Sequence, residues 1–326
     1  MKFRLIAIAS VLPLSLVAGC SSDADKKVDK TAQADTVSTA GGSEPDAVLR
    51  ATKRKYLGIY VEGKYKDNPA AQSKVLKKNV GRAPNIMKHF QAWNAPYPAD
   101  WAKAAYKVGA LPQLEWEPHG VPLKTIAAGD SDAFLHAYAK QVKASKVPVM
   151  ISFGHEMNGW WYDWATKKTT AKQFVAAWRH IHDIFKAEGA TNAKWLWAPN
   201  VIYPMPKVKL KPLYPGNSYV DWVGVIGYYK GQKNATFKGF FEPTIKKIRT
   251  FSKKPILLAE TGSKRGPKRN KEIADLLTNV AKRKDIIGLI WFNMNKPGDG
   301  DYRIEATKSS LKTFRTYVTK YPYGRK

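Results

Sequence analysis

The chain has 326 residues, of which 44% are apolar, so it is long enough for one α/β barrel and can bury a large core. A formal net charge of +29 favours polyanionic partners, namely nucleic acid, membrane lipid or anionic envelope polymers, although many exported proteins are simply basic. Cys20 is the single cysteine, which excludes an intrachain disulfide framework.

The N-terminus is typical of a bacterial lipoprotein signal peptide. Residues 1–19 combine a basic start with an apolar stretch that is too short and too interrupted for an ordinary transmembrane helix. The letters VAGC, which end at Cys20, resemble the lipobox, and this implies cleavage before Cys20 and acylation of the cysteine. An ordinary signal peptide with an incidental cysteine is the alternative. We predict an exported protein, lipid-anchored to the outer face of the bacterial cell membrane, or secreted.

Residues 20–48 are predicted to form a disordered tether. They consist mainly of small and polar residues, and such a segment buries too little apolar surface to offset the entropy of ordering it. Residues 21–48 hold six acidic residues and three lysines, so the excess positive charge lies in residues 49–326. We predict that residues 49–326 form one folded domain.

A β-rich run, a loop and a helical segment alternate through this domain. Helices are clearest at 130–146 and 170–189, where apolar residues recur at helical spacing, whereas the Pro-rich link at 201–216 predicts little helix. The predicted strands are 55–61, 86–93, 110–117, 147–156, 193–200, 221–229, 254–261 and 286–294.

Eight near-continuous apolar strands that alternate with helices predict an α/β fold, most simply a closed (β/α)8 TIM barrel. An open doubly wound sheet is the alternative. Residues 62–69 read EGKYKDNP, without the Gly-rich loop that cradles phosphates, which argues against a nucleotide site. In a barrel, catalytic residues lie at the carboxyl ends of the strands.

Two glutamates are predicted at such ends, Glu156 on the fourth strand and Glu260 on the seventh. Retaining glycoside hydrolysis needs this kind of pair: an acid protonates the leaving oxygen, and a carboxylate roughly 5–5.5 Å away attacks the anomeric carbon. Either glutamate alone would more simply form a salt bridge to a lysine. Two of them on separate strands favour catalysis, for which no cofactor is needed.

A zinc site is the competing interpretation of the letters HEMNG at 155–159. A zincin motif places a second histidine four residues after the first, but Gly159 stands there. His180 and His182 lie two apart on a predicted helix and therefore face different directions. The sequence predicts no metal ligands.

The tryptophans near strand ends fit a carbohydrate. Sugar rings present apolar C–H faces that stack on indole, while their hydroxyls bind polar side chains. We expect about half of these tryptophans to pack in the core instead, including Trp195 and Trp222. The aromatic candidates at or near strand ends are Trp93, Trp116, Trp160, Trp161, Trp164, Trp197, Tyr228 and Trp291.

Several motifs, in order, resemble glycoside hydrolase family 26, whose best-known members are retaining endo-β-1,4-mannanases. HEMNGWWYDW (155–164) is similar to the family's acid/base segment, and ILLAETGS (256–263) is similar to its nucleophile segment. The resemblance covers about residue 85 to the end and implies a catalytic barrel that cleaves a polysaccharide. Supporting motifs are LEWEP (114–118), LWAPN (196–200), YVDWVGVIGYY (219–229) and WFNMNK (291–296).

The resemblance implies a role for each matched residue. Glu156 would donate the proton, with a pKa raised by aromatic neighbours and by its negative partner. Glu260 would be the nucleophile, kept ionised and aimed by a hydrogen bond from Tyr228. Asn158 would orient the acid, and Trp161 would form part of a sugar platform. The predicted substrate-binding residues are His155, Asn158, Trp161, Tyr228, Trp116 and Trp291.

Two positions depart from the family's pattern. Ile226 stands where mannanases usually carry Asp, and Ser152 stands where Arg is frequent. These departures leave hydrolysis intact but weaken mannan as substrate, so xylan, mixed-linkage glucan or an anionic exopolysaccharide is an alternative. The loop after the seventh strand could bind an anionic glycan or envelope polymer, or be a solvated loop; its basic residues are Lys264, Arg265, Lys268 and Arg269.

We therefore predict a monomeric, lipid-anchored, retaining endo-glycoside hydrolase that acts on β-1,4-mannosidic or related linkages. A non-catalytic glycan-binding protein is the rival from another class, but it would not need both carboxylates. Nucleic acid is not a predicted partner, because the basic residues are scattered over all the helices.

Overall fold

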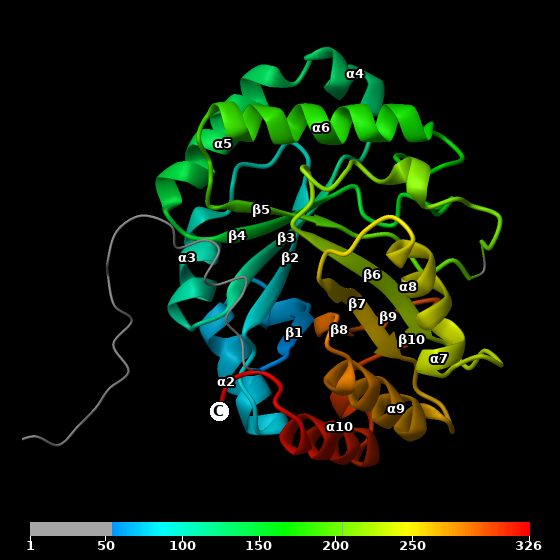
Figure 1. The fold of residues 1–326 in the computed structure, drawn as a ribbon. Helices are drawn as coiled ribbons and strands as arrows, with labels where there is room; N and C mark the ends of the chain where they lie inside the picture. Colours follow the sequence, from blue (N-terminus) through cyan, green and yellow to red (C-terminus); the bar gives the residue numbers. More distant parts are fainter. Residues whose placement is uncertain (1–53, 204) are drawn as a thin grey trace, which may run out of the picture. The chain divides into compact units, whose positions relative to one another are not determined.

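The computed structural model describes residues 54–203 and 205–326, which belong to one compact unit (Figure 1). The predicted signal peptide, Cys20 and the predicted tether lie outside the described residues.

Eight parallel strands form a closed barrel in which each strand pairs with the next along the chain. Strand β8 closes on β1 in a register that runs from Tyr56 opposite Gly288 to Val61 opposite Asn293. The prediction of a (β/α)8 barrel is confirmed, and the open sheet is excluded. The strands are β1 Tyr56–Val61, β2 Ile86–Ala92, β3 Leu111–Glu117, β4 Val149–Phe153, β5 Ala193–Trp197, β6 Trp222–Tyr229, β7 Ile256–Ser263 and β8 Ile286–Asn293.

Helices cover the outside of the barrel because each has one apolar stripe. In α6, Phe174, Trp178 and Ile181 recur at helical spacing and are fully buried, and the helix begins at a capping box formed by Thr170 and Gln173. The helices are α2 Pro69–Val80, α3 Ala99–Lys107, α4 Leu123–Ala128, α5 Asp132–Ser145, α6 Ala171–Ala187, α7 Phe237–Phe240, α8 Glu242–Arg249, α9 Arg269–Lys282 and α10 Lys308–Lys320.

The connections differ in length and structure. Between β5 and β6 the described residues contain only a 3-10 turn, η2 (Lys211–Leu213), as the prolines predicted. Two further 3-10 turns of the same length are η1 (Gly63–Tyr65) and η3 (Ile304–Ala306). Strands β9 (Asn295–Lys296) and β10 (Gly300–Asp301) form a small hairpin after β8. None of the described helices is long and apolar enough to cross a membrane.

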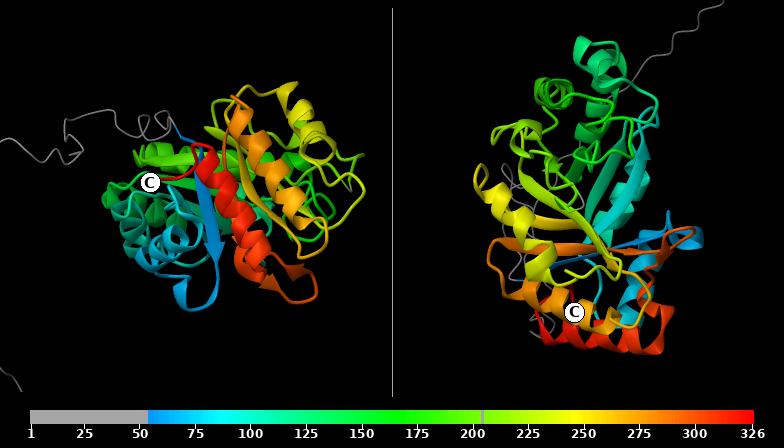
Figure 2. Two further views of the ribbon diagram at one scale, coloured as in Figure 1. Left: turned by 90° about the horizontal axis from the view of Figure 1, so that it is seen from below. Right: turned by 90° about the vertical axis from the view of Figure 1, so that its right-hand side faces the viewer.

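The barrel interior is filled by side chains. Every strand contributes at least one buried apolar residue to a single inner cluster, so the barrel is a packed core without a pore, and a site can form only at an end. Helix α10 lies beside α2, where the two ends of the described chain meet (Figure 2). The inner cluster includes Tyr56, Ile86, Leu111, Met150, Leu196, Trp222, Leu257 and Ile290.

Candidate active site

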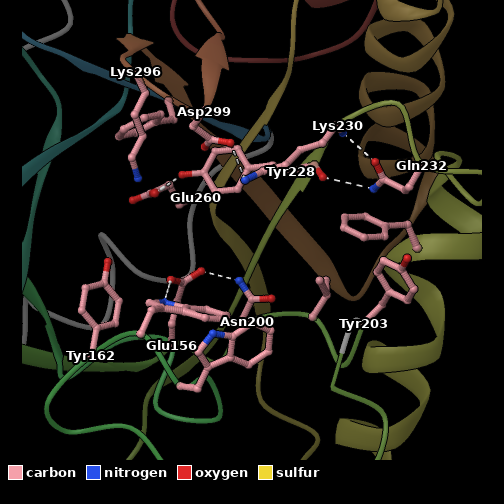
Figure 3. A pocket seen from close by; sticks show the side chains of 15 residues that line it. Glu156, Tyr162, Asn200, Tyr203, Tyr228, Lys230, Gln232, Glu260, Lys296 and Asp299 are labelled. Carbon is pink, nitrogen blue, oxygen red and sulfur yellow. Dashed lines mark hydrogen bonds and ion pairs between the residues drawn. The ribbon is translucent and has the colours of Figure 1, made fainter.

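A cavity of about 540 Å³ lies at the carboxyl ends of the strands, and both Glu156 and Glu260 line it. Their side chains point toward one another from two sides of the cavity (Figure 3). The structure therefore brings together the two glutamates that the sequence places 104 positions apart. The lining residues are Glu156, Trp160, Trp161, Tyr162, Asn200, Val201, Tyr203, Tyr228, Lys230, Gln232, Phe240, Glu260, Phe292, Lys296 and Asp299.

Glu156 lies in a turn rather than at the end of a strand. Strand β4 ends at Phe153, three residues earlier than predicted, and the Glu156 amide donates to the carbonyl of Ala198 at 2.8 Å. The φ of Glu156 is 53°, a left-handed conformation that only one other non-glycine residue adopts in the described part of the chain. Such a conformation is unfavourable unless the surrounding structure imposes it, and it is concentrated at functional sites.

Two donors hold the Glu156 carboxylate. Trp161 Nε1 donates to Oε2 at 2.7 Å, and Asn200 Nδ2 donates to Oε1. Asn158 does not touch the acid: its side chain donates to the Asn200 carbonyl at 2.9 Å and accepts from the Asn200 amide at 2.8 Å. Asn158 is fully buried and does not line the cavity, so it orients the acid through Asn200. Asn200 was missed as a site residue, although it ends the motif LWAPN.

The Glu156 carboxyl is biased toward its protonated form. Burial, followed by the negative charge of Glu260, raises its pKa to about 7, against the opposing effect of the Asn200 and Trp161 donors. Glu117 at the end of β3 also has a pKa raised to about 7, mainly by burial, but it does not line the cavity.

Glu260 lies within β7 rather than at its end. Leu257 and Ala259 point into the barrel interior, so strict alternation would direct Glu260 outward. The pairing of β7 with β8 is irregular between Leu258 and Thr261, and such irregularities re-aim side chains beside active sites. The Glu260 carboxylate accepts a hydrogen bond from the Tyr228 hydroxyl, as the resemblance implied.

A buried lysine completes the surroundings of Glu260. Lys88 Nζ lies 2.6 Å from Glu260 Oε2 and 2.7 Å from Glu115 Oε2. Burial disfavours the ammonium, but the two carboxylates outweigh it and hold the pKa of Lys88 above its ordinary value. Sequence reasoning missed Lys88 and Glu115. The available signal was a charged residue in the middle of each of two central parallel strands, where a charge needs a partner.

His155 lies behind the cavity wall. It is 1% exposed, its Nε2 is 3.1 Å from the Tyr162 hydroxyl, and its Nδ1 is 3.4 Å from Glu115 Oε1. Burial, followed by the charge of Lys88, lowers the pKa of His155 to about 3, so the imidazole is neutral. His155 does not line the cavity, whereas its hydrogen-bond partner Tyr162 does.

The aromatic wall consists of fewer tryptophans than the sequence suggested. Trp160 and Trp161 are 45% and 39% exposed, pack edge to face with ring centroids 5.0 Å apart, and both line the cavity. Tyr203, which is 50% exposed, adds a third ring. These rings offer the flat apolar surface that the ring faces of sugars need.

Trp116 and Trp291 do not belong to the site, so the prediction that they bind substrate is wrong. Trp116 is fully buried against Tyr138, and its Nε1 donates to the Trp93 carbonyl. Trp291 is fully buried, and its Nε1 donates to the Tyr302 carbonyl. Alternation turns both indoles toward the helices. The tryptophans that pack in the core are Trp93, Trp101, Trp116, Trp164, Trp178, Trp195, Trp197, Trp222 and Trp291.

The two departures from the family's pattern lie below the cavity. Ile226 is fully buried in the inner cluster, and Ser152 is fully buried as well. Neither residue lines the cavity.

No group of three or more His, Cys, Asp or Glu within 54–203 and 205–326 is arranged to hold a metal ion. The cavity offers a carboxyl with a raised pKa, a carboxylate paired with an ammonium, and aromatic faces.

A closed (β/α)8 barrel whose cavity at the carboxyl ends of the strands is lined by two unlike carboxyls is an arrangement typical of barrel glycosidases. The model of glycosyl hydrolase family 26 matches residues 120–295, more than half of the chain. The chain belongs to this family, which confirms the resemblance drawn from its motifs.

Curated relatives agree with this assignment. The chain is 29% identical over 259 residues to Endoglucanase H of Acetivibrio thermocellus, and the match covers 75% of this chain and 28% of that protein. It is 28% identical over 103 residues to mannan endo-1,4-beta-mannosidase A and B of Caldalkalibacillus mannanilyticus, covering 29% of this chain and 19% of that protein. The chain thus spans about a quarter or less of these relatives.

Solved structures share the fold. The catalytic domain of a family 26 endo-β-1,4-mannanase from Bacillus sp. JAMB-750 superposes with a TM-score of 0.63 at 17% identity, covering 86% of this chain and 89% of that one. A family 26 β-mannanase from Bacteroides ovatus gives 0.59 at 17% identity, covering 86% and 92%.

Proposed function

We propose that the protein is a retaining, endo-acting glycoside hydrolase that cleaves β-1,4-mannosidic linkages. The observation that carries this proposal is the pair of glutamates in one aromatic-walled cavity, one biased toward protonation and the other bound to an ammonium. Family membership and the names of the mannosidase relative and the solved mannanases support the substrate class.

In the first step, the Glu260 carboxylate attacks the anomeric carbon while the Glu156 carboxyl gives its proton to the leaving oxygen, so the glycosidic C–O bond breaks and a glycosyl ester forms. The Lys88 ammonium and the Tyr228 hydroxyl aim the attacking carboxylate. Loss of the negative charge of Glu260 in the ester lowers the proton affinity of Glu156.

In the second step, Glu156 is ionised and takes a proton from water, whose oxygen attacks the same carbon and releases Glu260. Two displacements at one carbon leave its configuration unchanged. Trp161 donates from its Nε1 to the Glu156 carboxylate and presents its ring to the cavity. One side chain therefore fixes the position of the acid relative to the sugar that stacks on it.

The proposal is tested by incubating purified protein with linear β-1,4-mannan and following polymer size and new chain ends. Endo action gives a rapid fall in mean polymer length, and retention gives the β-anomer first in proton NMR spectra. Products of α configuration, or release of only mono- or disaccharides from the chain ends, would contradict the retaining or the endo part of the proposal.

A second candidate substrate is a β-glucan, which the match to Endoglucanase H over 75% of this chain favours. Mixed-linkage glucan and xylan assayed beside mannan at equal mass concentration distinguish these substrates by relative kcat/KM.

We also propose that the mature protein is held at the outer face of the cell membrane by a lipid on Cys20, on the strength of the VAGC motif. Metabolic labelling with a radioactive fatty acid should label the wild type and leave Cys20→Ala unlabelled. Equal labelling of the two proteins would contradict the anchor.

A further inference from the structure

A second hollow, of about 310 Å³, adjoins the catalytic cavity, and Lys230 lines both. It lies where β6 and β7 end: the Lys264 amide donates to the Tyr229 carbonyl at 2.8 Å, and the Arg265 amide donates to the Asp301 carbonyl at 2.8 Å. We call this hollow the basic recess. Its lining residues are Lys230, Gly231, Lys264, Arg265, Gly266, Pro267, Lys268, Arg269 and Glu272.

Three cations of the basic recess face solvent. Lys264, Arg265 and Lys268 are exposed, and no carboxylate in the described part of the chain forms an ion pair with any of them. Their neighbours behave differently: Lys230 pairs with Asp299 at 2.8 Å, so its charge is partly compensated. The recess therefore presents a local excess of positive charge.

The carboxyl group that lines the recess does not cancel this excess. Glu272 is 4% exposed, and the Ser263 hydroxyl donates to its Oε2 at 2.5 Å. It is one carboxyl beside three exposed cations, so it can offset the charge of at most one of them.

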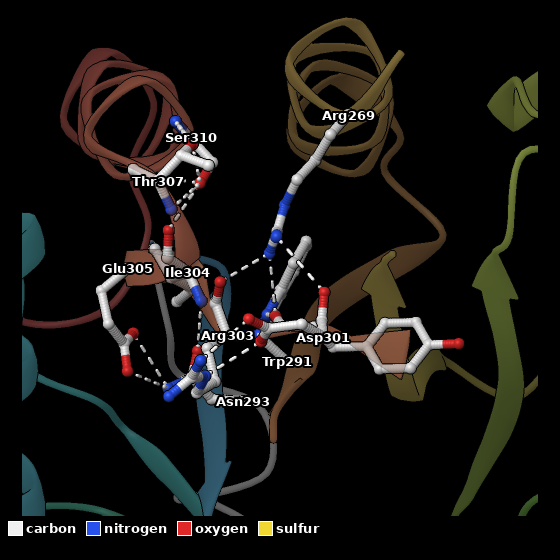
Figure 4. A network of polar contacts seen from close by, with 10 residues as sticks. Arg269, Trp291, Asn293, Asp301, Arg303, Ile304, Glu305, Thr307 and Ser310 are labelled. Carbon is white, nitrogen blue, oxygen red and sulfur yellow. Dashed lines mark hydrogen bonds and ion pairs between the residues drawn. The ribbon is translucent and has the colours of Figure 1, made fainter. Parts of the chain in front are cut away.

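Arg269 is buried beneath the recess and holds its loop in place. It is 3% exposed, and its guanidinium donates to the carbonyls of Asp301, Tyr302 and Arg303 at 3.3, 3.0 and 2.7 Å (Figure 4). The loop after β7 is thereby tied to the segment after β8, so the exposed cations are carried by an anchored loop.

We propose that the basic recess binds the carboxylate of a uronic acid unit in a glycan whose neighbouring units occupy the catalytic cavity. This rests on the proposed function, because it assigns an acidic glycan class to the same cavity. Lys264 lies one residue beyond the end of β7 and four residues after Glu260, about 13 Å of extended chain, which a glycan spans with a few sugar units. A guanidinium and two ammonium groups match a carboxylate in charge and in hydrogen-bond donors.

The test uses one polysaccharide in two forms, a glucuronic acid-bearing mannan and its carboxyl-reduced neutral counterpart. At low salt we expect the wild type to show a kcat/KM about 10-fold higher on the acidic form, falling to about twofold or less near 0.5 M NaCl because salt screens exposed charges. The variant Lys264→Gln/Arg265→Gln/Lys268→Gln should lose the preference and keep its activity on the neutral form within about twofold.

The matched control is Lys74→Gln/Lys77→Gln/Lys78→Gln, which removes the same charge from exposed positions on α2, outside the recess. It should keep the acidic preference. The proposal is overturned if the recess variant keeps its preference for the acidic form, or if both variants lose that preference equally. Binding to anionic lipid is measured by co-sedimentation with phosphatidylglycerol vesicles. The proposal is also overturned if the three recess substitutions weaken only this vesicle binding.

Affinity electrophoresis of the Glu260→Gln variant in gels that contain either polymer tests the recess independently of cleavage. Stronger retardation by the acidic form supports carboxylate binding at the recess, whether or not the wild-type protein hydrolyses either polymer. Absence of hydrolysis would count against the proposed function alone. Equal retardation by the two forms would refute the recess.

Discussion

The surroundings of the two cavity glutamates differ in backbone and in charge. Glu156 lies in an irregular turn and is held by two neutral donors, whereas Glu260 lies within a strand and is bound to the buried Lys88 ammonium. Neutral donors permit a proton to stay on a buried carboxyl, while an ammonium favours the charged form. One residue type thereby obtains two opposite chemical roles from its neighbours.

The largest loss of activity is expected when either glutamate is replaced by glutamine, because the difference between the acid and the nucleophile is then lost. Glu260→Gln should lower kcat by more than about 10⁴-fold on every substrate because no ester can form. Glu156→Gln should lower it by roughly 10²–10⁴-fold on polysaccharide, but much less for ester formation from aryl glycosides whose leaving group needs no proton. Steady-state and burst kinetics measure both effects, and equal losses on both substrate types in both variants would contradict the division of roles.

The next largest loss of activity is expected from replacing Lys88, the ammonium bound to Glu260. Lys88→Met leaves Glu115 and Glu260 buried without a counter-charge, so we expect a loss of about 3–5 kcal/mol in the free energy of unfolding. We also expect kcat to fall about 10²-fold through misplacement of the nucleophile. Urea unfolding and pH–rate profiles measure the two consequences.

A second variant separates positioning from stability at this place. Lys88→Met/Glu115→Gln has one fewer buried charge than Lys88→Met. It should therefore recover part of the lost free energy of unfolding, while kcat stays low. Wild-type kcat in a stable double variant would show that Lys88 is only structural.

Tyr228 should have a smaller effect than Lys88 because it contributes a hydrogen bond without a charge. Tyr228→Phe removes the hydroxyl that donates to Glu260, and a hydrogen bond to a charged group is worth about 1.5–3 kcal/mol, or roughly 10–150-fold in kcat. Tyr203→Phe is the matched control, since it removes an exposed hydroxyl at the same cavity. Similar losses in both variants would exclude a specific role for Tyr228.

The smallest effect is expected from changing a neighbour of Glu156, and it should appear in the pH dependence of kcat/KM. The pKa of Glu156 is raised to about 7, so its acid form, and with it kcat/KM, is lost as the pH rises through that value. Trp161→Phe removes a donor that lowers this pKa, so the alkaline limb should move up by about 0.7 pH unit for a bond of about 1 kcal/mol. A limb that stays in place or moves down would contradict the role of Trp161 Nε1.

The strands and helices of the barrel could be predicted because their signals are local. Six of the eight strands begin within one residue of the predicted start, since apolar runs and the breaks between them are properties of adjacent residues. The ends of β4 and β7 could not be predicted in this way. The turn at Glu156 and the irregularity beside Glu260 depend on neighbouring strands that are distant in sequence.

Only those site residues that stand in local motifs could be predicted from the sequence. Glu156, Glu260, Trp161 and Tyr228 stand in motifs of adjacent residues, and all four line the cavity. The role of Lys88 depends on partners 27 and 172 positions away, and no local pattern specifies such a pairing.

The sequence by itself determined the eight-fold alternation of strands and helices, the two glutamates and the family, because each is encoded in short stretches of chain. Only the tertiary structure decided which tryptophans face the cavity, which basic residues after β7 are free, and which glutamate keeps its proton. Burial and charge pairing decide these outcomes, and both arise where distant segments meet in a closed barrel.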